Sequence, residues 1–328
     1  MLLAADVGGT KTNVALISPE RGPRHPVVKK TFPSNEYTSL GDLVADFIAE
    51  VDQPVEFASI GVAGPVVDRQ AKITNLHWVI DERKLETELG FAPIRLLNDL
   101  QAIAYAVPLL ESGDLQTLAE GKQIRHGNKA VIAPGTGLGE AFIAWDGSRY
   151  RAFPSEGGHT DFGPNSPREM GLLRYLQERL GHVSYERVCS GSGMPNIYEY
   201  LKDSGVEEPT WLADKLATVE DPTPVIARAA LGEERSCTLC TETLDIFVSV
   251  LGAEAGNLAL KVLPTGGVYV GGGIPPRILP LIEEGFLDSF RDKGRFSDLL
   301  SDIPVHIILN PEVALMGAAC FGLDFLGG

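Results

Sequence analysis

The chain has few cysteines, few basic residues and no long apolar run, and each shortage excludes a class of protein. Among 328 residues there are four cysteines, too few for a disulfide framework in a chain of this length. No apolar run reaches the ~18 residues that a membrane span needs, and no basic region opens the N-terminus as in a signal peptide. Lys and Arg number 28 against 44 Asp and Glu, which gives a formal net charge of −16. Nucleic-acid binding depends on basic side chains that neutralise phosphates, so we expect no binding to nucleic acid. From the lack of a membrane span and of a signal peptide we expect a cytoplasmic protein that does not bind a membrane.

Several common active-site motifs are also missing. The sequence contains no GxxxxGK[ST] phosphate loop and no GxSxG nucleophile elbow. The glycines of GTGLG at 135–139 are spaced two and two, which differs from the dinucleotide-binding fingerprint. Cys237 and Cys240 form a CxxC pair, but no second pair or nearby histidine completes a zinc site. The two cysteines are at helical spacing, so we expect them to pack in the core, with a zinc or redox role as the alternative.

Strand and helix patterns alternate along the chain and predict an α/β fold. Strands are expected at residues 2–7, 13–17, 57–62, 94–97 and 305–309, and strand–glycine units at 130–144 and 267–274. Helices are expected at residues 39–51, 100–106, 237–262 and 312–326. Ser39 is the predicted N-cap of the first helix, and Ser166 with Pro167 and Glu169 predicts a further helix start.

Three glycine clusters each follow an apolar strand, at 6–12 (DVGGTKT), 135–139 (GTGLG) and 271–273 (GGG). Glycine lets the backbone approach an anion and aim several N–H groups at it, although a tight hairpin also favours glycine. Three clusters at strand ends, two of them with threonine hydroxyls, favour phosphate binding. In so acidic a chain, backbone amides and a divalent cation must supply most of the attraction. The first two clusters echo one another and indicate an internal duplication.

Two aspartates lie where strands end. Asp6 closes a buried strand beside the first glycine cluster, which suits a magnesium-associated role through water, and a hydrogen-bonded turn aspartate is the alternative. The strand at 94–97 ends in Asn98 and Asp99, and ligand sites in open α/β sheets lie at the carboxyl ends of strands. A carboxylate there can accept the proton of an attacking hydroxyl, whereas the alternative is that Asp99 only N-caps the following helix.

Two further polar groups indicate a ligand that carries neutral hydroxyls. Glu156 and His159 are separated by two glycines, and Glu186 precedes the glycine turn at 189–193. Carboxylates and imidazole accept from and donate to neighbouring hydroxyl groups. The set is too sparse for direct metal ligation by side chains, so hydroxyl recognition is the favoured interpretation.

Together these motifs resemble those of the bacterial glucokinases, which belong with the hexokinases to the actin-like sugar kinase superfamily. The matching segments are DVGGTKT at 6–12 and IAPGTGLGEA at 132–141 (phosphate loops), GVYVGGGI at 267–274 (adenosine side), LLNDL at 96–100 (catalytic aspartate), EGGH at 156–159 and YERVCSGSG at 185–193 (sugar loops), IGVAGPV at 60–66 and TNLHW at 74–78. The resemblance implies an α/β, two-domain actin-like ATPase (ribonuclease H-like) sugar kinase fold with a cleft between the domains. The small domain would comprise 1–109 plus about 301–328, and the large domain 110–300.

The resemblance also implies an activity, the Mg²⁺- and ATP-dependent phosphorylation of glucose at its 6-OH by a homodimer. Asp99 would be the general base. The sugar would be held by Asn98, Asp99, Glu156, His159 and Glu186. The nucleotide would be bound by Asp6, Gly8, Gly9, Thr10, Lys11, Thr12, Thr136, Gly137 and Gly272, with Lys11 either meeting phosphate or facing solvent. No cysteine follows EGGH, so the zinc loop of the related repressor/kinase group is not expected.

Transfer of the γ-phosphoryl group would depend mostly on positioning and charge neutralisation, with the base adding about 10²–10⁴-fold. The two domains would close to exclude water as a competing nucleophile. Other hypotheses are a kinase for another hexose or with polyphosphate as donor, and a non-catalytic sugar sensor, which needs no base. An actin-like ATPase or polyphosphatase is a further one, but it has no use for the polar set of Glu156, His159 and Glu186.

Overall fold

The computed structural model of the chain describes residues 1–327 except 52, 74, 75 and 234. Its strands are β1 (Leu2–Val7), β2 (Lys11–Ile17), β3 (Val28–Pro33), β4 (Phe57–Val62), β5 (Val66–Val67), β6 (Gln70–Lys72), β7 (Val79–Asp81), β8 (Ile94–Asn98), β9 (Leu115–Ala119), β10 (Lys129–Pro134), β11 (Leu138–Trp145), β12 (Tyr150–Ser155), β13 (Val268–Val270) and β14 (Val305–Ile308). Its α-helices are α1 (Leu40–Glu50), α2 (Glu82–Leu89), α3 (Asp99–Ala106), α4 (Pro167–Leu180), α5 (Met194–Asp203), α6 (Thr210–Leu216), α7 (Thr223–Ala230), α8 (Thr238–Val262), α9 (Leu279–Arg291), α10 (Ser297–Ser301) and α11 (Val313–Gly327).

Two of the helix starts predicted from the sequence are confirmed in atomic detail. The Ser39 side chain accepts from the N–H of Asp42 at the start of α1, and Ser166 accepts from the N–H of Glu169 at the start of α4. In a standard capping box the Glu169 carboxylate would accept from the N–H of the N-cap residue Ser166. Here it accepts instead from the N–H of the preceding residue, Asn165, at 2.7 Å. Local polar signals therefore fixed these boundaries to within one residue.

The chain divides into two compact units. Unit 1 contains Met1–Ser112, Ala141–Pro154 and Asn310–Gly328, and unit 2 contains Gly113–Glu140 and Ser155–Leu309. The boundaries expected from the sequence differ from this division mainly at 141–154 and at 301–309. Residues 141–154 group with unit 1, where Gln101 Nε2 donates to the Ala152 carbonyl at 3.3 Å. Residues 305–308 group with unit 2 because β14 pairs with β13 and β9.

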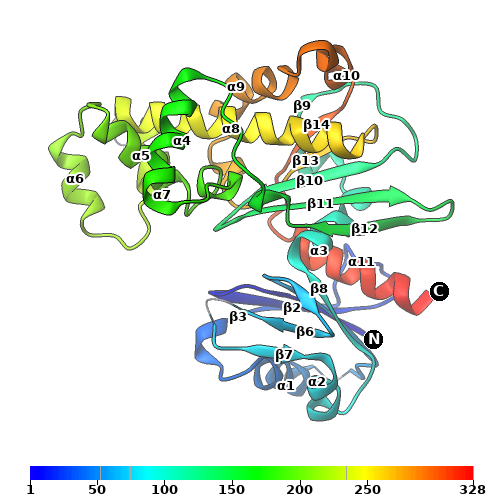
Figure 1. Cartoon of the computed structure of the whole chain (residues 1–328). Helices are drawn as coiled ribbons and strands as arrows, with labels where there is room; N and C mark the ends of the chain where they lie inside the picture. The colour runs from blue at the N-terminus through cyan, green and yellow to red at the C-terminus, as the bar shows by residue number, and fades with distance from the viewer. Residues whose placement is uncertain (52, 74–75, 234, 328) are drawn as a thin grey trace. The chain divides into compact units, whose positions relative to one another are not determined.

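Unit 1 contains a five-stranded sheet with helices on both faces (Figure 1) and a small three-stranded sheet, β5-β6-β7. The strand order is β3-β2-β1-β4-β8, with β1, β4 and β8 parallel. One face packs against α1 and α2 through Phe47 and Leu85. The other face packs against α11 through Leu315 and Ala319, and α3 lies beside α11. The three parallel strands are covered on both faces, which is why their sequences are nearly continuous apolar runs.

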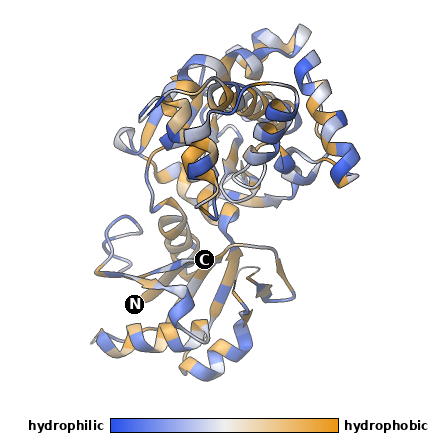
Figure 2. Cartoon of the chain, turned by 90° about the vertical axis from the view of Figure 1, so that its left-hand side faces the viewer, coloured by the Kyte–Doolittle hydropathy of each residue, from blue (hydrophilic) through white to orange (hydrophobic). Residues whose placement is uncertain are grey.

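Unit 2 combines a sheet with a helical layer built around α8. The sheet order is β12-β11-β10-β13-β14-β9, with β10, β13 and β14 parallel, and most of β11 and β12 is counted with unit 1 in the division above. Among the described residues, α8 is the one helix long and apolar enough to cross a membrane, and 78% of its most apolar window is buried inside the unit. Cys237 and Cys240 are buried at its start, as predicted, and burial raises the pKa of the Cys240 thiol. In Figure 2, apolar segments lie inside each unit, while the outer helices alternate between hydrophilic and hydrophobic residues.

The two sheets share a strand order that agrees with the predicted duplication. In unit 1 the order is β2-β1-β4-β8, and in unit 2 it is β11-β10-β13-β14. In each, a glycine turn joins the first two strands along the chain, and the next two follow in parallel. The echo between the glycine clusters at 6–12 and 135–139 therefore marks equivalent positions in the two sheets.

Candidate active site

Three parallel strands of unit 1 end at one edge of its sheet and bring two predicted groups together. Val7 of β1 pairs with Val62 of β4, and Val62 pairs with Asn98 of β8. The first glycine turn and the Asn98–Asp99 pair therefore lie at the same edge of the sheet, at the ends of β1 and β8, which are separated by the single strand β4. Because neighbouring strands are ~4.8 Å apart, the two groups lie on the order of 10 Å from each other, a distance that one bound molecule can bridge.

The first glycine turn is supported from inside the unit. The N–H of Gly8 donates to the carbonyl of Lys11 at 3.0 Å, and its own carbonyl accepts from Ser34 Oγ at 2.9 Å. Ser34 Oγ is 2.9 Å from Thr12 Oγ1, and the Thr12 side chain is fully buried. Thr12 thus holds the turn in shape, and its hydroxyl points toward Ser34 and not toward solvent.

The outer part of the same turn is open. Gly9 is half-buried, and Thr10 and Lys11 are exposed. In the part of the chain that the structure describes, the N–H groups of Gly9 and Thr10 have no hydrogen-bond partner within the protein. A pair of unpartnered amides in a glycine turn is suited to binding a phosphate oxygen.

Asp6 is half-buried directly before this turn, and Asn13 Nδ2 donates to its Oδ2 at 3.4 Å. Burial raises the pKa of Asp6, while the Asn13 amide and the charge of Lys11 act in the opposite direction. Over the described residues, no three His, Cys, Asp or Glu side chains gather as a metal site. Mg²⁺ usually keeps several waters and takes one or two carboxylates plus substrate phosphates, so a lone carboxylate beside a phosphate turn fits that ion.

Asn98, and not Asp99, is the N-cap of α3. Asn98 Oδ1 accepts from the N–H of Leu100 at 2.9 Å and of Gln101 at 3.2 Å, and its Nδ2 donates to the carbonyl of Gly64 at 3.1 Å. Asp99 is the first residue of the helix and is half-buried, with Oδ1 2.9 Å from the N–H of Leu100. The interpretation of Asp99 as a mere N-cap is therefore wrong, because a neighbouring amide performs that role. The positive end of the helix also favours an ionised carboxylate at this position.

The second glycine turn, in unit 2, is fastened to the turn at 189–193. Gly191 N–H donates to the carbonyl of Gly135 at 2.7 Å, and Ser192 N–H donates to that of Thr136 at 3.2 Å. The third cluster lies beside it, because β10 and β13 are parallel neighbours. Gly272 has φ +86°, and a Cβ there would overlap the carbonyl oxygen of Pro134. Only glycine allows this backbone to lie against the end of β10.

Glu156, His159 and Glu186 come together in unit 2. His159 Nε2 lies 3.8 Å from Glu156 Oε2, and His159 Nδ1 lies 3.8 Å from Glu186 Oε1. The side chains of Glu156 and His159 are 70% and 58% exposed, whereas Glu186 is 24% exposed. Glu186 Oε2 accepts from the N–H of Leu138 at 3.0 Å. Glu186 thus reaches from the polar set to the second glycine turn.

The two glycines between Glu156 and His159 allow this loop to press against β11. A Cβ on Gly158 would overlap the carbonyl oxygen of Leu138, and a Cβ on Gly157 would overlap Glu140 Oε2. The short 3₁₀ turn η4 (Gly157–His159) therefore rests directly on the strand. The sequence pattern revealed the glycines but not the strand against which they pack.

A cavity of about 560 Å³ opens beside the second and third glycine clusters in unit 2. Its lining includes Gly135, Thr136, Ser192, Gly273, Ile274, Arg277, Ala227 and the segment 220–224. Thr223 Oγ1 donates to the carbonyl of Gly191 at 2.7 Å and ties that segment to the turn at 189–193. Arg277 and the segment EDPTP at 220–224 were not predicted from the sequence, although the two prolines of the segment indicate an ordered loop.

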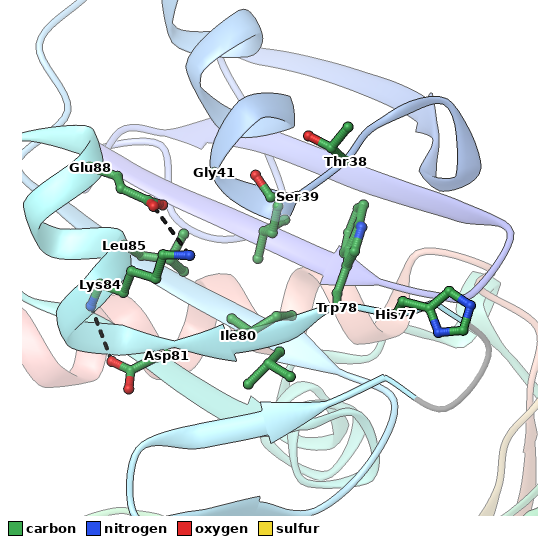
Figure 3. Close-up of a pocket in the computed structure, with 12 residues that line it drawn as sticks. Thr38, Ser39, Gly41, His77, Trp78, Ile80, Asp81, Lys84, Leu85 and Glu88 are labelled. Carbon is green, nitrogen blue, oxygen red and sulfur yellow. Dashed lines mark hydrogen bonds and ion pairs between the residues drawn. The ribbon is translucent and has the colours of Figure 1, made fainter.

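Unit 1 holds another hollow, of about 270 Å³, between the start of α1 and the β7–α2 segment. Figure 3 shows Thr38 and Ser39 on one side of it, Trp78 and Ile80 below, and the Lys84–Glu88 ion pair of 3.5 Å on α2. Trp78 is buried and belongs to the core of the unit. His77 and Trp78 belong to the motif TNLHW, of which Thr74 and Asn75 lie outside the described residues.

Known proteins resemble this chain over nearly its whole length. The glucokinase family model matches residues 3–324. The glucokinase of Trichormus variabilis is 43% identical over 337 residues, covering 97% of this chain and 98% of that protein. The glucokinase of Yersinia pestis is 37% identical over 327 residues, covering 99% and 97%.

Solved structures agree with these relatives. The crystal structure of a glucokinase from an Antarctic psychrotroph superposes with a TM-score of 0.82 at 30% identity, covering 98% of each chain. A ROK-family glucokinase from Streptomyces griseus, crystallised with glucose and AMPPNP, shares the fold with a TM-score of 0.65 at 20% identity, covering 98% of this chain and 99% of that one.

The fold is that of the actin-like sugar kinases, which confirms the fold class predicted from the sequence. The chain belongs to the glucokinase family, and the resemblance found in its motifs is thereby confirmed. Members of this family are enzymes that phosphorylate glucose with ATP as the donor.

Proposed function

We propose that this chain transfers the γ-phosphoryl group of Mg-ATP to the 6-OH of glucose, with Asp99 as the general base. The observation that carries the proposal is the common strand edge in unit 1. There, Asp99 follows β8 at a position equivalent to that of the glycine turn after β1. A base and a phosphate-binding turn at one edge are what an attack by a hydroxyl on phosphorus requires.

The sugar hydroxyls are assigned to two sets of side chains in this proposal. In unit 1, Asn98 and Asp99 face the reacting hydroxyl, and the two hydrogen bonds that Asn98 accepts fix the start of α3. In unit 2, Glu156, His159 and Glu186 bind the remaining hydroxyls. Their spacing of 3.8 Å supports this assignment, because it lets neighbouring hydroxyl groups of one ring contact successive side chains.

The phosphates are assigned to the two glycine turns. Gly9 and Thr10 would bind them through backbone amides, and Gly8 would line them as part of the turn whose shape its own N–H holds. Lys11 would lie at the rim, while Thr12 supports the turn from below. In unit 2, Thr136 and Gly137 would take the same part, and Gly272 brings the third cluster beside them. When bound, Mg²⁺ supplies positive charge to the phosphate oxygens, and Asp6 would hold it through water.

The adenosine of ATP is assigned to the 560 Å³ cavity of unit 2. Its mixed lining of Ile274, Ala227 and prolines with Arg277 suits an aromatic base with a polar edge. Replacing Ala227 with Phe would fill part of this space, and we expect the KM for ATP to rise roughly tenfold, a loss of about 1.4 kcal/mol of binding. The KM for glucose should change little.

Steady-state kinetics with ATP varied at saturating glucose measures this effect. Ala217→Phe is the matched control, because Ala217 is exposed in the same unit and does not line the cavity. A KM for ATP that moves equally in both variants, or in neither, would remove the cavity from the nucleotide site.

The proposed function is tested by measuring ADP release from Mg-ATP with and without glucose. Glucose-dependent release supports a kinase, and sugar binding without ADP release supports the non-catalytic sensor. Release that does not depend on sugar supports an ATPase. Parallel assays with fructose, mannose, N-acetylated sugars and polyphosphate define the substrates. Homodimer formation and a cytoplasmic location stay predictions, the first open to sedimentation analysis.

A further inference from the structure

A buried carboxyl group lies under the sugar loop and has no part in the mechanism above. Glu140, on β11, is 1% exposed. Within the described part of the chain, its Oε1 has no hydrogen-bond partner. Its Oε2 lies against Gly157, so closely that a Cβ on that glycine would overlap it. A buried carboxylate without donors is costly, whereas a protonated carboxyl group is tolerated.

A second buried carboxyl group, that of Glu254 on α8, is close to Glu140 and is fully buried. Unlike Glu140, Glu254 has donors, with Lys261 Nζ at 3.3 Å from Oε1 and Asn257 Nδ2 at 2.9 Å from Oε2. Burial first, and the negative charge of Glu254 second, raise the pKa of Glu140 to about 8. A side-chain hydrogen bond between Glu140 and Glu254 acts in the same direction. The pair is therefore asymmetric, because Glu254 accepts from Lys261 and Asn257, whereas Oε1 of Glu140 has no partner among the described residues.

The pair is connected to both sugar segments of unit 2. Glu140 contacts Gly157 in the loop that carries Glu156 and His159. On the other side, Asn257 donates to the hydroxyl of Tyr185 at 2.9 Å as well as to Glu254. Tyr185 opens η5 (Tyr185–Arg187), which carries Glu186. The N–H of Tyr185 donates to the carbonyl of Thr160 at 3.1 Å and joins the two segments directly.

We propose that Glu140 is a positioning residue that remains protonated beside the ionised Glu254 and so holds the loop at 156–159 and the turn at 185–187 in the geometry that binds the sugar. This inference rests on the proposed function, because it takes Glu156, His159 and Glu186 as the sugar ligands. Ionisation of Glu140 places a second negative charge beside Glu254, and repulsion then displaces the loop that rests on Glu140.

The groups that face the pair offer little compensation for a second charge. Lys261 is already paired with Glu254, and its side chain is 52% exposed. Burial lowers the pKa of Lys293, although Glu254 opposes that shift, so this ammonium is less available at alkaline pH. The pKa values of Tyr185 and Cys189 are raised, by burial first and then by Glu254. Both groups therefore stay neutral in the range where Glu140 titrates.

The expected result is a KM for glucose that rises with pH in the wild-type enzyme. If the ionised form binds no sugar, this KM increases about tenfold for each pH unit above the pKa of Glu140. Glu140→Gln keeps the shape and remains neutral, so its KM should stay low and flat between pH 6 and pH 9.5. Glu283→Gln, an exposed glutamate of α9 in the same unit, is the matched control and should follow the wild type.

The same proton makes folding stability depend on pH. Folding raises the pKa of Glu140 from 4.5 to about 8. The proton on Glu140 therefore stabilises the folded state fully below pH 4.5, and this stabilisation is lost as the pH rises to about 8. Glu140→Gln has no proton to lose, and its melting temperature relative to the wild type should therefore increase from pH 5 to pH 8. A group that only fills space would leave this difference constant.

Infrared spectroscopy of the wild-type chain tests the protonation without any variant. A carboxylic-acid C=O band should be present at neutral pH, disappear above the pKa, and be missing from Glu140→Gln. Absence of that band, or a KM for glucose with the same pH dependence in wild type and Glu140→Gln, overturns the inference. The variant Asp99→Asn distinguishes failure of this inference from failure of the proposed function. Full turnover in Asp99→Asn would contradict the role of Asp99 as general base, whereas the results for Glu140→Gln bear only on the role of Glu140.

Discussion

Replacing Asp99 with Asn is expected to lower kcat for glucose phosphorylation by about 10²–10⁴-fold, the usual contribution of a general base. The amide keeps the size of the carboxylate and can still hydrogen-bond to the sugar, so the KM for glucose should change much less than kcat. The cap of α3 is supplied by Asn98, and the helix should therefore remain intact. Stopped assays of ADP formation at saturating glucose and ATP measure the effect.

The matched control is Asp42→Asn. Asp42 lies in the first turn of α1 in the same unit, and its carboxylate likewise accepts hydrogen bonds at a helix start, from Ser39 and Thr38. This variant removes the favourable interaction of a carboxylate with a helix N-terminus, but it does not remove a catalytic base. Equal activity losses in the two variants, or near-normal kcat in Asp99→Asn, would exclude Asp99 as the base.

Replacing Gly317 with Ala is expected to destabilise unit 1 by about 3 kcal/mol or more, because overpacking of a tight helix contact has no room to relax. Gly317 is buried on α11, and a Cβ there would overlap the carbonyl oxygen of Ala102 on α3. The obstacle is backbone, so one helix must move as a whole. Thermal unfolding should show a midpoint lower by roughly 6–12 °C.

This change also reaches the site, since α3 begins at Asp99. We expect kcat to fall in the variant at temperatures where it is still folded. Gly285→Ala is the matched control, because Gly285 lies inside α9 and its Cβ would meet Val248 Cγ1 at an ordinary 3.5 Å. Alanine there should be neutral or stabilising by up to about 1 kcal/mol. If both variants melt like the wild type, the close packing of α11 on α3 is not present in solution.

Patterns local in sequence were sufficient for much of the fold. The apolar runs at 2–7 and 57–62 and the serine caps at 39 and 166 each act within a few residues, so their strands and helices could be predicted. Asp99 illustrates the limit of such rules. It directly precedes the helix predicted at 100–106, whereas in the structure it is the first residue of α3 and Asn98 is the cap. The choice between the two depends on backbone dihedral angles, which residue preferences do not distinguish.

Features that depend on distant segments could not be read from the sequence. Glu140 and Glu254 lie on different elements, and only the packing of α8 brings them together. The role of Gly158 depends on the carbonyl of Leu138, and the buried orientation of Thr12 depends on Ser34. Residues 141–154 group with unit 1 because of hydrogen bonds to α3 and α11, which the strand pattern does not reveal.

The central claim is that the γ-phosphoryl group of ATP is transferred to the 6-OH of glucose. Phosphorus NMR of the reaction of this chain with Mg-ATP and glucose tests it most directly, with 6-deoxyglucose as the matched control. We predict a sugar phosphate whose phosphorus couples to the two protons on carbon 6, and no transfer to 6-deoxyglucose. ADP and inorganic phosphate as the only new species, or a phosphate on another hydroxyl, would contradict the account.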